Sequence, residues 1–262
     1  MTVLNKIYRK AQRVLFNNIP VNRIRILLHK DHLAKIYIKN WQTLGYDSKA
    51  TALENSGITQ TPEILQTLQN CHDEIQKIYT ENLHNKGRIL DIGCGPGLFL
   101  NDFKDSTDEL WGVDMNPDFI RKAKTLVPKA HLIEGDFLSA QIPGTFKLIY
   151  SSSVLMYIER SQIKAFFDKI YQLLDQDGFL CIHYPHALQW KDLLYHDLSY
   201  IRYSPAFLEK ILGDTFSIIK HEHLYDQRKV KKYDHFHYYY PDGTNKRLDT
   251  LQNSYILIAQ KK

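Results

Sequence analysis

The sequence predicts an α/β fold, in which a mostly parallel β-sheet carries helices on both faces and is preceded by a helical extension. Two patterns in the 262 residues indicate this. Residues 1–85 carry apolar side chains at the three- to four-residue spacing of amphipathic helices. From Gly87 onward, short apolar segments alternate with segments of helical spacing, as in repeated strand–helix–strand units. We therefore expect a helical extension over residues 1–85 and one sheet-containing domain over residues 86–262.

Within the extension, two helical stretches are expected. The first lies in residues 1–39, where basic residues separate short apolar stripes, and the second runs from Pro62 to about Leu83. The polar stretch over residues 45–60 is expected to be a loop. A basic amphipathic segment such as residues 1–39 suits either a lid over an active site or a segment that lies on an anionic surface.

The domain begins with two strands and two helices. Arg88–Ile92 is a short apolar strand that leads through a glycine-rich turn into a helix over Leu98–Phe103. Leu110–Asp114 is expected to be the second strand. Asn116-Pro117 then predicts the start of a helix, because asparagine caps free N–H groups and proline suits the first helical turn.

Five further strands are expected after this helix. Their segments are Ala130–Glu134, Phe146–Ser151, Phe179–Tyr184, Phe216–Ile219 and Ser254–Ala259. A helix that begins near Ser161 separates the second and third of these segments, and its apolar residues recur at a regular three- to four-residue period. With the two strands before Asn116, the total is seven.

The glycine-rich turn is the segment that indicates chemistry, and it reads Ile89-Leu-Asp-Ile-Gly-Cys-Gly-Pro-Gly97. Glycine is needed where the backbone adopts a positive φ or approaches a ligand closely. The N–H groups at the start of the next helix favour anionic or polar ligand groups, such as a carboxylate or a pyrophosphate. A dinucleotide fingerprint would require glycine or alanine at position 98, where this chain has Leu98. Asp91, just before the turn, would repel a pyrophosphate but could bind a cationic amino group.

The segment Ile89–Gly97 resembles the first motif of the class I S-adenosylmethionine-dependent methyltransferases, and the similarity extends over residues 86–185. This resemblance implies a Rossmann-like, seven-stranded sheet with S-adenosylmethionine as the cofactor. By position, Asp91 and the backbone at three glycines would hold the methionine portion of that cofactor. These glycines are Gly93, Gly95 and Gly97.

The resemblance also assigns the rest of the cofactor site. Asp114 would accept both ribose hydroxyls, which a carboxylate can do at once. It lies 19 positions after Gly95, near the spacing of about 20 expected for ribose recognition in such folds. Met115 would pack on the adenine, Asp136 would accept its exocyclic amine, and Phe137 would lie along the ring.

Ser151 and Ser152 end the fourth strand, where family members line the reaction centre, and the resemblance assigns both to the cofactor site. The chain departs from the family pattern at two places. Lys147 stands where many members have aspartate, and the expected turn Asp175–Gly178 replaces Pro-Gly-Gly. Both departures concern local geometry rather than cofactor binding.

Three side chains near the reaction centre are candidates for action on the acceptor. An amine acceptor needs only to be neutral, whereas a hydroxyl acceptor gains from a general base. His183 and His186 follow the fifth strand at the sheet edge where such folds bind ligands, and are candidates for the base. Tyr157 is a candidate to position the acceptor. The alternative for all three is a purely structural role, as polar side chains that are hydrogen-bonded at the surface or in the core.

A small-molecule or saccharide acceptor is expected. Aromatic residues with polar tips suit sugars and flat molecules, although they are also common in packing. Those outside the core segments are Tyr37, Trp41, Tyr46, Tyr195, Tyr200, Tyr203 and residues 235–240. Residues 41–47 are weakly similar to the region ahead of the core in methyltransferases that act on bacterial surface saccharides.

The charge distribution leaves other partners open. Residues 1–39 contain nine Lys or Arg and only one acid, Asp31, so this arm carries +8 and the rest of the chain −3. The arm suits peripheral contact with an anionic membrane. An alternative function is an RNA or protein methyltransferase that uses the arm to bind its substrate. Nucleic acid is not favoured as the partner, because the rest of the chain is slightly acidic. A cofactor-binding protein without turnover is a further alternative. The three scattered cysteines predict neither disulfides nor a metal site, and no apolar run could span a bilayer, so a cytoplasmic protein is expected.

Overall fold

The computed structural model describes residues 72–81, 87–105, 109–186, 203–223, 236–239, 245–248 and 253–262. The helices and basic arm expected in residues 1–39 and the loop over residues 45–60 lie outside these ranges. Of the helix expected from Pro62 to about Leu83, residues 72–81 are described, and they are helical. No helix among the described residues is long and apolar enough to cross a membrane.

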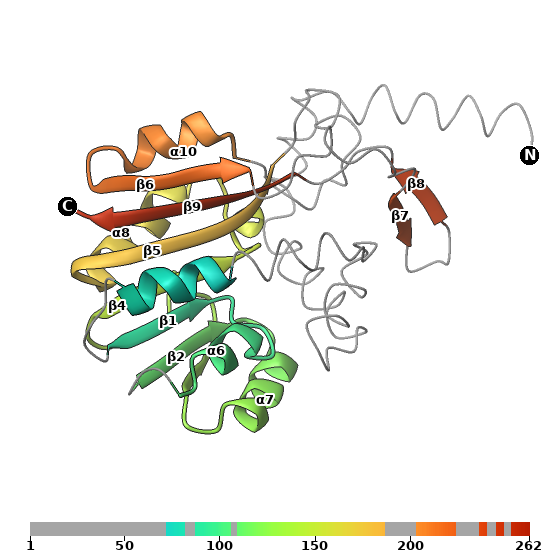
Figure 1. Ribbon diagram of the computed structural model, residues 1–262. Helices are drawn as coiled ribbons and strands as arrows, with labels where there is room; N and C mark the ends of the chain where they lie inside the picture. Colours follow the sequence, from blue (N-terminus) through green and yellow to red (C-terminus); the bar gives the residue numbers. More distant parts are fainter. Residues whose placement is uncertain are drawn as a thin grey trace, which may run out of the picture.

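Seven strands form one sheet in the order β3-β2-β1-β4-β5-β9-β6 (Figure 1). In chain order they are β1 (Arg88–Ile92), β2 (Glu109–Asp114), β3 (His131–Glu134), β4 (Phe146–Ser152), β5 (Leu174–His186), β6 (Phe216–His223) and β9 (Asn253–Lys261). Strands β1 to β5 pair in parallel, whereas β9 runs antiparallel between β5 and β6. The predicted seven-stranded, mostly parallel sheet is therefore confirmed. A separate hairpin of β7 (Phe236–Tyr239) and β8 (Asn245–Leu248) was not predicted.

Helices cover both faces of the sheet, as Figure 1 shows. On one face, α8 (Ile163–Leu173) and α10 (Pro205–Leu212) share an apolar cluster with β1, β4 and β5. On the other face, the helix over residues 72–81, α6 (Leu98–Asp102) and α7 (Pro117–Leu126) share a second cluster. Successive strand residues therefore bury opposite faces, which explains why the strands read as continuous apolar runs.

Two helices begin with the same local signal. The side chain of Asn116 accepts a hydrogen bond from the N–H of Asp118 at 2.9 Å, with proline next in the sequence, as predicted for α7. Ser204 does the same for α10, where its side chain accepts from the N–H of Phe207 at 3.3 Å. In both cases a side-chain oxygen satisfies an N–H group that the first helical turn leaves without a partner.

The start of β5 differs from the sequence prediction. Instead of a turn over Asp175–Gly178, the strand begins at Leu174, which pairs with Phe146 directly after α8 ends. The irregularity moves into the strand as a register shift, and Asp177 adopts a φ of +64°. Aspartate tolerates this left-handed conformation better than most residues, so the expected turn becomes a bulge within the strand pair.

Candidate functional site

The glycine loop between β1 and α6 has left-handed backbone at all three glycines, with φ of +71° at Gly93, +52° at Gly95 and +85° at Gly97. A Cβ on Gly93 would lie 2.3 Å from a methyl carbon of Val154, so this glycine is required for the loop to pack against the segment after β4. A Cβ on Gly95 would meet no heavy atom of the described residues within 4 Å. Gly95 therefore faces open space, where the backbone can approach a ligand closely.

Asp114 connects this loop to the end of β2. Its Oδ2 accepts a hydrogen bond from the N–H of Gly95 at 2.9 Å, and its Oδ1 accepts from the N–H of Asn116 at 2.8 Å. The side chain is buried, with 3% of the residue exposed. Because each carboxylate oxygen has a second lone pair, both can still accept a hydrogen bond from a ligand hydroxyl.

Asp91 is a second buried carboxylate, at the end of β1 and paired in register with Gly112 of β2. Burial raises the pKa of Asp91 well above its usual value, and the negative charge of Asp114 raises it further. Burial also raises the pKa of Asp114, to about 6, although the N–H groups of Asn116 and Gly95 act in the opposite direction. A cation bound beside these groups would favour their ionised forms. The glycine loop therefore adjoins an acidic site that suits a cationic ligand group.

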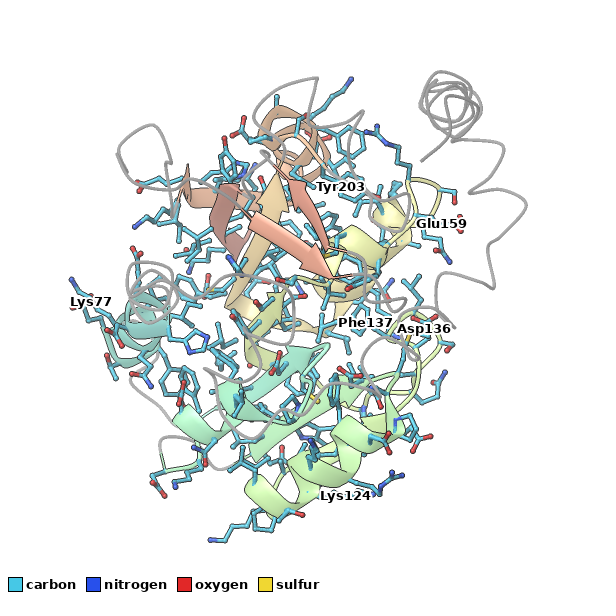
Figure 2. All side chains as sticks on the ribbon, turned by 90° about the vertical axis from the view of Figure 1, so that its right-hand side faces the viewer. Lys77, Lys124, Asp136, Phe137, Glu159 and Tyr203 are labelled. Carbon is cyan, nitrogen blue, oxygen red and sulfur yellow. The ribbon has the colours of Figure 1, made fainter. Side chains whose placement is uncertain are left out.

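The loop after β3 lies at the same edge of the sheet, because Asp114 and Glu134 are in register at the ends of parallel strands. Asp136 accepts a hydrogen bond from the N–H of Leu138 at 3.2 Å through Oδ1. Phe137 is buried, and its ring packs edge-on against Phe166 of α8, with the centroids 5.3 Å apart. Figure 2, which looks onto this edge, shows Asp136 and Phe137 beside each other. The loop is thus anchored to the core through Phe137.

At the ends of β4 and β5, the structure brings two predicted residues into contact. The hydroxyl of Ser152 lies 2.9 Å from Nδ1 of His183. His183 is buried, and its Nε2 has no hydrogen-bond partner among the described residues; the same holds for Oγ of Ser151. Burial lowers the pKa of His183 to about 4, with a smaller contribution from His72. His183 is therefore a neutral imidazole at neutral pH, which suits hydrogen bonding to an acceptor more than strong base catalysis.

The other predicted residues occupy nearby segments. Tyr157 is half-buried in the short 3₁₀ helix η1 (Leu155–Tyr157), which follows β4. Met115 is half-buried next to Asp114. His186 is the last residue of β5, and its backbone pairs with Asn253 of β9. The assignments of these residues to the acceptor or the adenine stay predictions.

Sequence reasoning missed several polar groups at this site. Nδ1 of His72 lies 3.0 Å from Oδ2 of Asp102, and its Nε2 lies 3.4 Å from the hydroxyl of Tyr150. The amide nitrogen Nδ2 of Asn116 is buried with no partner among the described residues. Its place two residues after Asp114 was a usable signal, but the sequence interpretation treated it only as a helix cap. Among the described residues, no group of three or more His, Cys, Asp or Glu side chains is placed to hold a metal ion.

Comparison with known proteins identifies the fold. Residues 89–178 match a family model described as a methyltransferase domain. The structure is similar to a magnesium protoporphyrin IX methyltransferase from Synechocystis solved with S-adenosylhomocysteine, with a TM-score of 0.59 and 14% identity over 90% of this chain and 99% of that one. An N-methyltransferase from Bradyrhizobium japonicum gives a TM-score of 0.55 and 14% identity over 75% of this chain and 97% of that one.

Residues 89–178 of this chain match a methyltransferase domain, and the structure has the fold of the class I methyltransferases.

Curated sequence relatives match only part of this chain. An uncharacterized methyltransferase of Schizosaccharomyces pombe is 33% identical over 30% of this chain and 32% of its own length. A trans-aconitate 2-methyltransferase of Sinorhizobium medicae is 28% identical over 39% of this chain and 40% of its own length. The chain thus spans less than half the length of these relatives.

The residues of the methyltransferase domain fit S-adenosylmethionine. The cofactor carries an ammonium and a sulfonium, which the acidic pair Asp91 and Asp114 would favour, and ribose hydroxyls that Asp114 could accept. The open space at Gly95 allows the cofactor to approach the backbone of the loop closely. The buried, unpartnered Nδ2 of Asn116 and Oγ of Ser151 are further groups that a ligand could satisfy.

Proposed function

We propose that this protein transfers the methyl group of S-adenosylmethionine to an oxygen or nitrogen atom of a small organic acceptor. The observation that carries the proposal is the contact between Asp114 and Gly95, which joins a ribose acceptor to an open glycine loop at the carboxyl edge of a parallel sheet. This edge is where open α/β sheets bind their ligands.

Each part of the site has a task in this proposal. Asp91 stabilises the ammonium of the methionine portion, and the glycine loop receives its carboxylate. Asp114 accepts the two ribose hydroxyls with its remaining lone pairs. Asp136 accepts the exocyclic amine of the adenine, while Met115 and Phe137 support the ring. Together these contacts fix the orientation of the reacting methyl group, which is the main contribution a protein makes to such a transfer.

On the acceptor side, His183 holds the nucleophile. When bound, S-adenosylmethionine supplies an electrophilic methyl group, whose bond to sulfur breaks as a bond to the acceptor forms, which leaves S-adenosylhomocysteine. The neutral Nε2 of His183 accepts a hydrogen bond from the O–H or N–H of the acceptor, and Ser152 fixes the orientation of the imidazole through Nδ1. The proton that the acceptor loses is released to solvent, while His183 positions the acceptor through this hydrogen bond. Tyr157 positions the acceptor from η1.

The acceptor class is proposed from two lines of support. Relatives with aligned sequence include a trans-aconitate 2-methyltransferase, and the structural neighbours include a magnesium protoporphyrin IX methyltransferase. Both names describe small organic acceptors. A saccharide is an acceptor of similar size, and it is the more specific acceptor that we propose within this class.

A transfer assay tests the proposal. The full chain is incubated with radiolabelled S-adenosylmethionine and a panel of carboxylic acids, phenols, amines and saccharides, with an RNA and a protein extract as separate arms. Transfer of label to at least one small acceptor, inhibited by S-adenosylhomocysteine, is expected. Transfer only to RNA or protein would contradict the small-acceptor assignment. Tight S-adenosylhomocysteine binding with no transfer to any arm would favour a binding protein without turnover.

A further inference from the structure

The loop that carries Asp136 is held together by its own N–H groups. The N–H groups of Ser139 and Ala140 donate to the carbonyl of Asp136 at 3.1 and 2.8 Å, and the N–H of Leu138 donates to its Oδ1 at 3.2 Å. This use of Oδ1 leaves Oδ2 for a donor from outside the loop. The direction of Oδ2 is therefore fixed by the conformation of the loop itself.

The carbonyl groups of the same loop converge on one side chain, Lys169 of α8. Its Nζ donates to the carbonyls of Phe137 at 2.6 Å, Leu138 at 3.2 Å and Ala140 at 2.6 Å. An ammonium has three N–H donors, so all three are used on this loop. The same Nζ lies 5.0 Å from the centroid of the Phe137 ring, in the range of a cation–π contact. Lysine side chains are usually exposed to solvent, whereas Lys169 is half-buried and directs its ammonium to a single turn.

We infer that Lys169 is a positioning residue for adenine recognition, which fixes the loop so that Oδ2 of Asp136 meets the exocyclic amine; this rests on the function proposed above. Recognition of this kind requires placement to within about 0.5 Å, which a short turn without a second anchor does not provide. Lys169 touches neither the cofactor nor the acceptor in this account. Its effect on the choice between an amine and an oxygen on the purine ring reaches the ligand through Asp136, because Phe137 contacts the ring of either ligand.

The chain contains a matched control for this interaction. Nζ of Lys261 donates to the carbonyls of Tyr171 at 2.8 Å and Leu174 at 2.7 Å, and lies 4.4 Å from the centroid of the Tyr171 ring. The chemistry is the same, an ammonium on backbone carbonyls beside an aromatic ring. Lys261, however, ends the antiparallel strand β9, so it lies at the amino edge of the parallel strands, opposite the cofactor site (Figure 1).

The test compares two ligands by calorimetric titration. S-adenosylhomocysteine carries the amine that Asp136 would accept, and S-inosylhomocysteine has an oxygen in its place. The wild-type protein is expected to prefer the first by more than tenfold, since a hydrogen bond to a charged group is worth at least about that factor. In Lys169→Met this preference should fall to within about threefold of equal affinity, whereas Lys261→Met should keep the wild-type preference even if it melts at a lower temperature.

Two further variants make the result decisive. Lys169→Gln keeps two N–H donors without the charge and should also lose the preference, so it replaces Lys169→Met if that variant does not fold. In an Asp136→Ala background, Lys169→Met should change the preference no further, because Lys169 acts through Asp136. Retention of the wild-type preference in either folded Lys169 variant would overturn the inference. Failure of the wild-type protein to bind S-adenosylhomocysteine at all would instead overturn the proposed function.

Discussion

Asp91 and Asp114 are buried at the ends of two adjacent strands, where burial raises the pKa of Asp91 and the negative charge of Asp114 raises it further. Two ionised carboxylates in this environment oppose folding of the ligand-free domain, because burial disfavours their charged forms. A bound cation would relieve this opposition. The two carboxylates therefore lower the stability of the ligand-free protein and raise its affinity for a cationic ligand.

Asp91→Asn should stabilise the ligand-free protein while it weakens cofactor binding. The pKa of Asp91 is higher in the folded protein than in the unfolded chain, so stability falls as the pH rises from the unfolded-state pKa toward the folded-state pKa, and the neutral amide removes this cost at pH 7.5. We expect the melting temperature to rise by at least about 2 °C, the shift that about 1 kcal/mol gives in a protein of this size. The exposed Asp168→Asn on α8 serves as the control and should change little. A lower melting temperature for Asp91→Asn would contradict the electrostatic account.

The affinity for S-adenosylhomocysteine should fall at acid pH. Burial raises the pKa of Asp114 to about 6 in the free protein, and only the ionised carboxylate accepts both ribose hydroxyls. A proton therefore competes with the ligand below pH 6. We expect the dissociation constant, measured by calorimetry, to rise at least about tenfold between pH 7 and pH 5. A constant value over this range would show that Asp114 does not hold the ribose in its ionised form.

Substitutions at Gly95 should separate binding from folding. Gly95→Val is disfavoured twice, because a β-branched residue resists a φ of +52° and its side chain fills the open space above the loop. Gly95→Asn fills the same space but tolerates the positive φ. We therefore expect both variants to lose cofactor binding, with a melting temperature near that of the wild type for Gly95→Asn. Retained binding in either variant would mean that the loop does not touch the cofactor.

His183→Gln should reduce turnover without a matching loss of cofactor affinity. The side chain positions the acceptor in our proposal, so kcat should fall at least about tenfold, as for loss of a hydrogen bond that orients the nucleophile. The dissociation constant of S-adenosylhomocysteine should stay within about threefold. His131→Gln is the control, since His131 is exposed at the start of β3 and stacks on Trp111. Equal losses of kcat and of cofactor affinity in His183→Gln would place His183 in the cofactor site instead.

Local signals account for what the sequence predicted well. The strand ends at Asp91 and Asp114, the glycine loop and the Asn116 cap each depend on residues within a few positions of one another. The contact between Ser152 and His183 joins residues 31 positions apart, and the three hydrogen bonds of Lys169 span about the same separation. Such contacts depend on which strands become neighbours and on the register between them. Sequence periodicity predicted β4 and β5 as consecutive strands of the chain, but it could not supply the register between them.

The start of β5 shows the same limit in the fold itself. The turn expected over Asp175–Gly178 was inferred from residue types that favour turns, and those types are present. Leu174 pairs with Phe146 and Phe179 pairs with Leu148, so Asp175–Gly178 form a bulge whose residues have no partner on β4. The local residue types therefore located the irregular segment, whereas the strand pairing before it depends on a tertiary contact that they could not reveal.

The central claim, that this domain binds S-adenosylmethionine through Asp114 and the glycine loop, is tested most directly by titration of S-adenosylhomocysteine into the wild-type protein and Asp114→Ala. Loss of two charge-assisted hydrogen bonds, each worth about 1.5–3 kcal/mol, predicts a dissociation constant more than tenfold weaker in the folded variant. An unchanged dissociation constant in folded Asp114→Ala, or no binding to the wild-type protein, would contradict the claim.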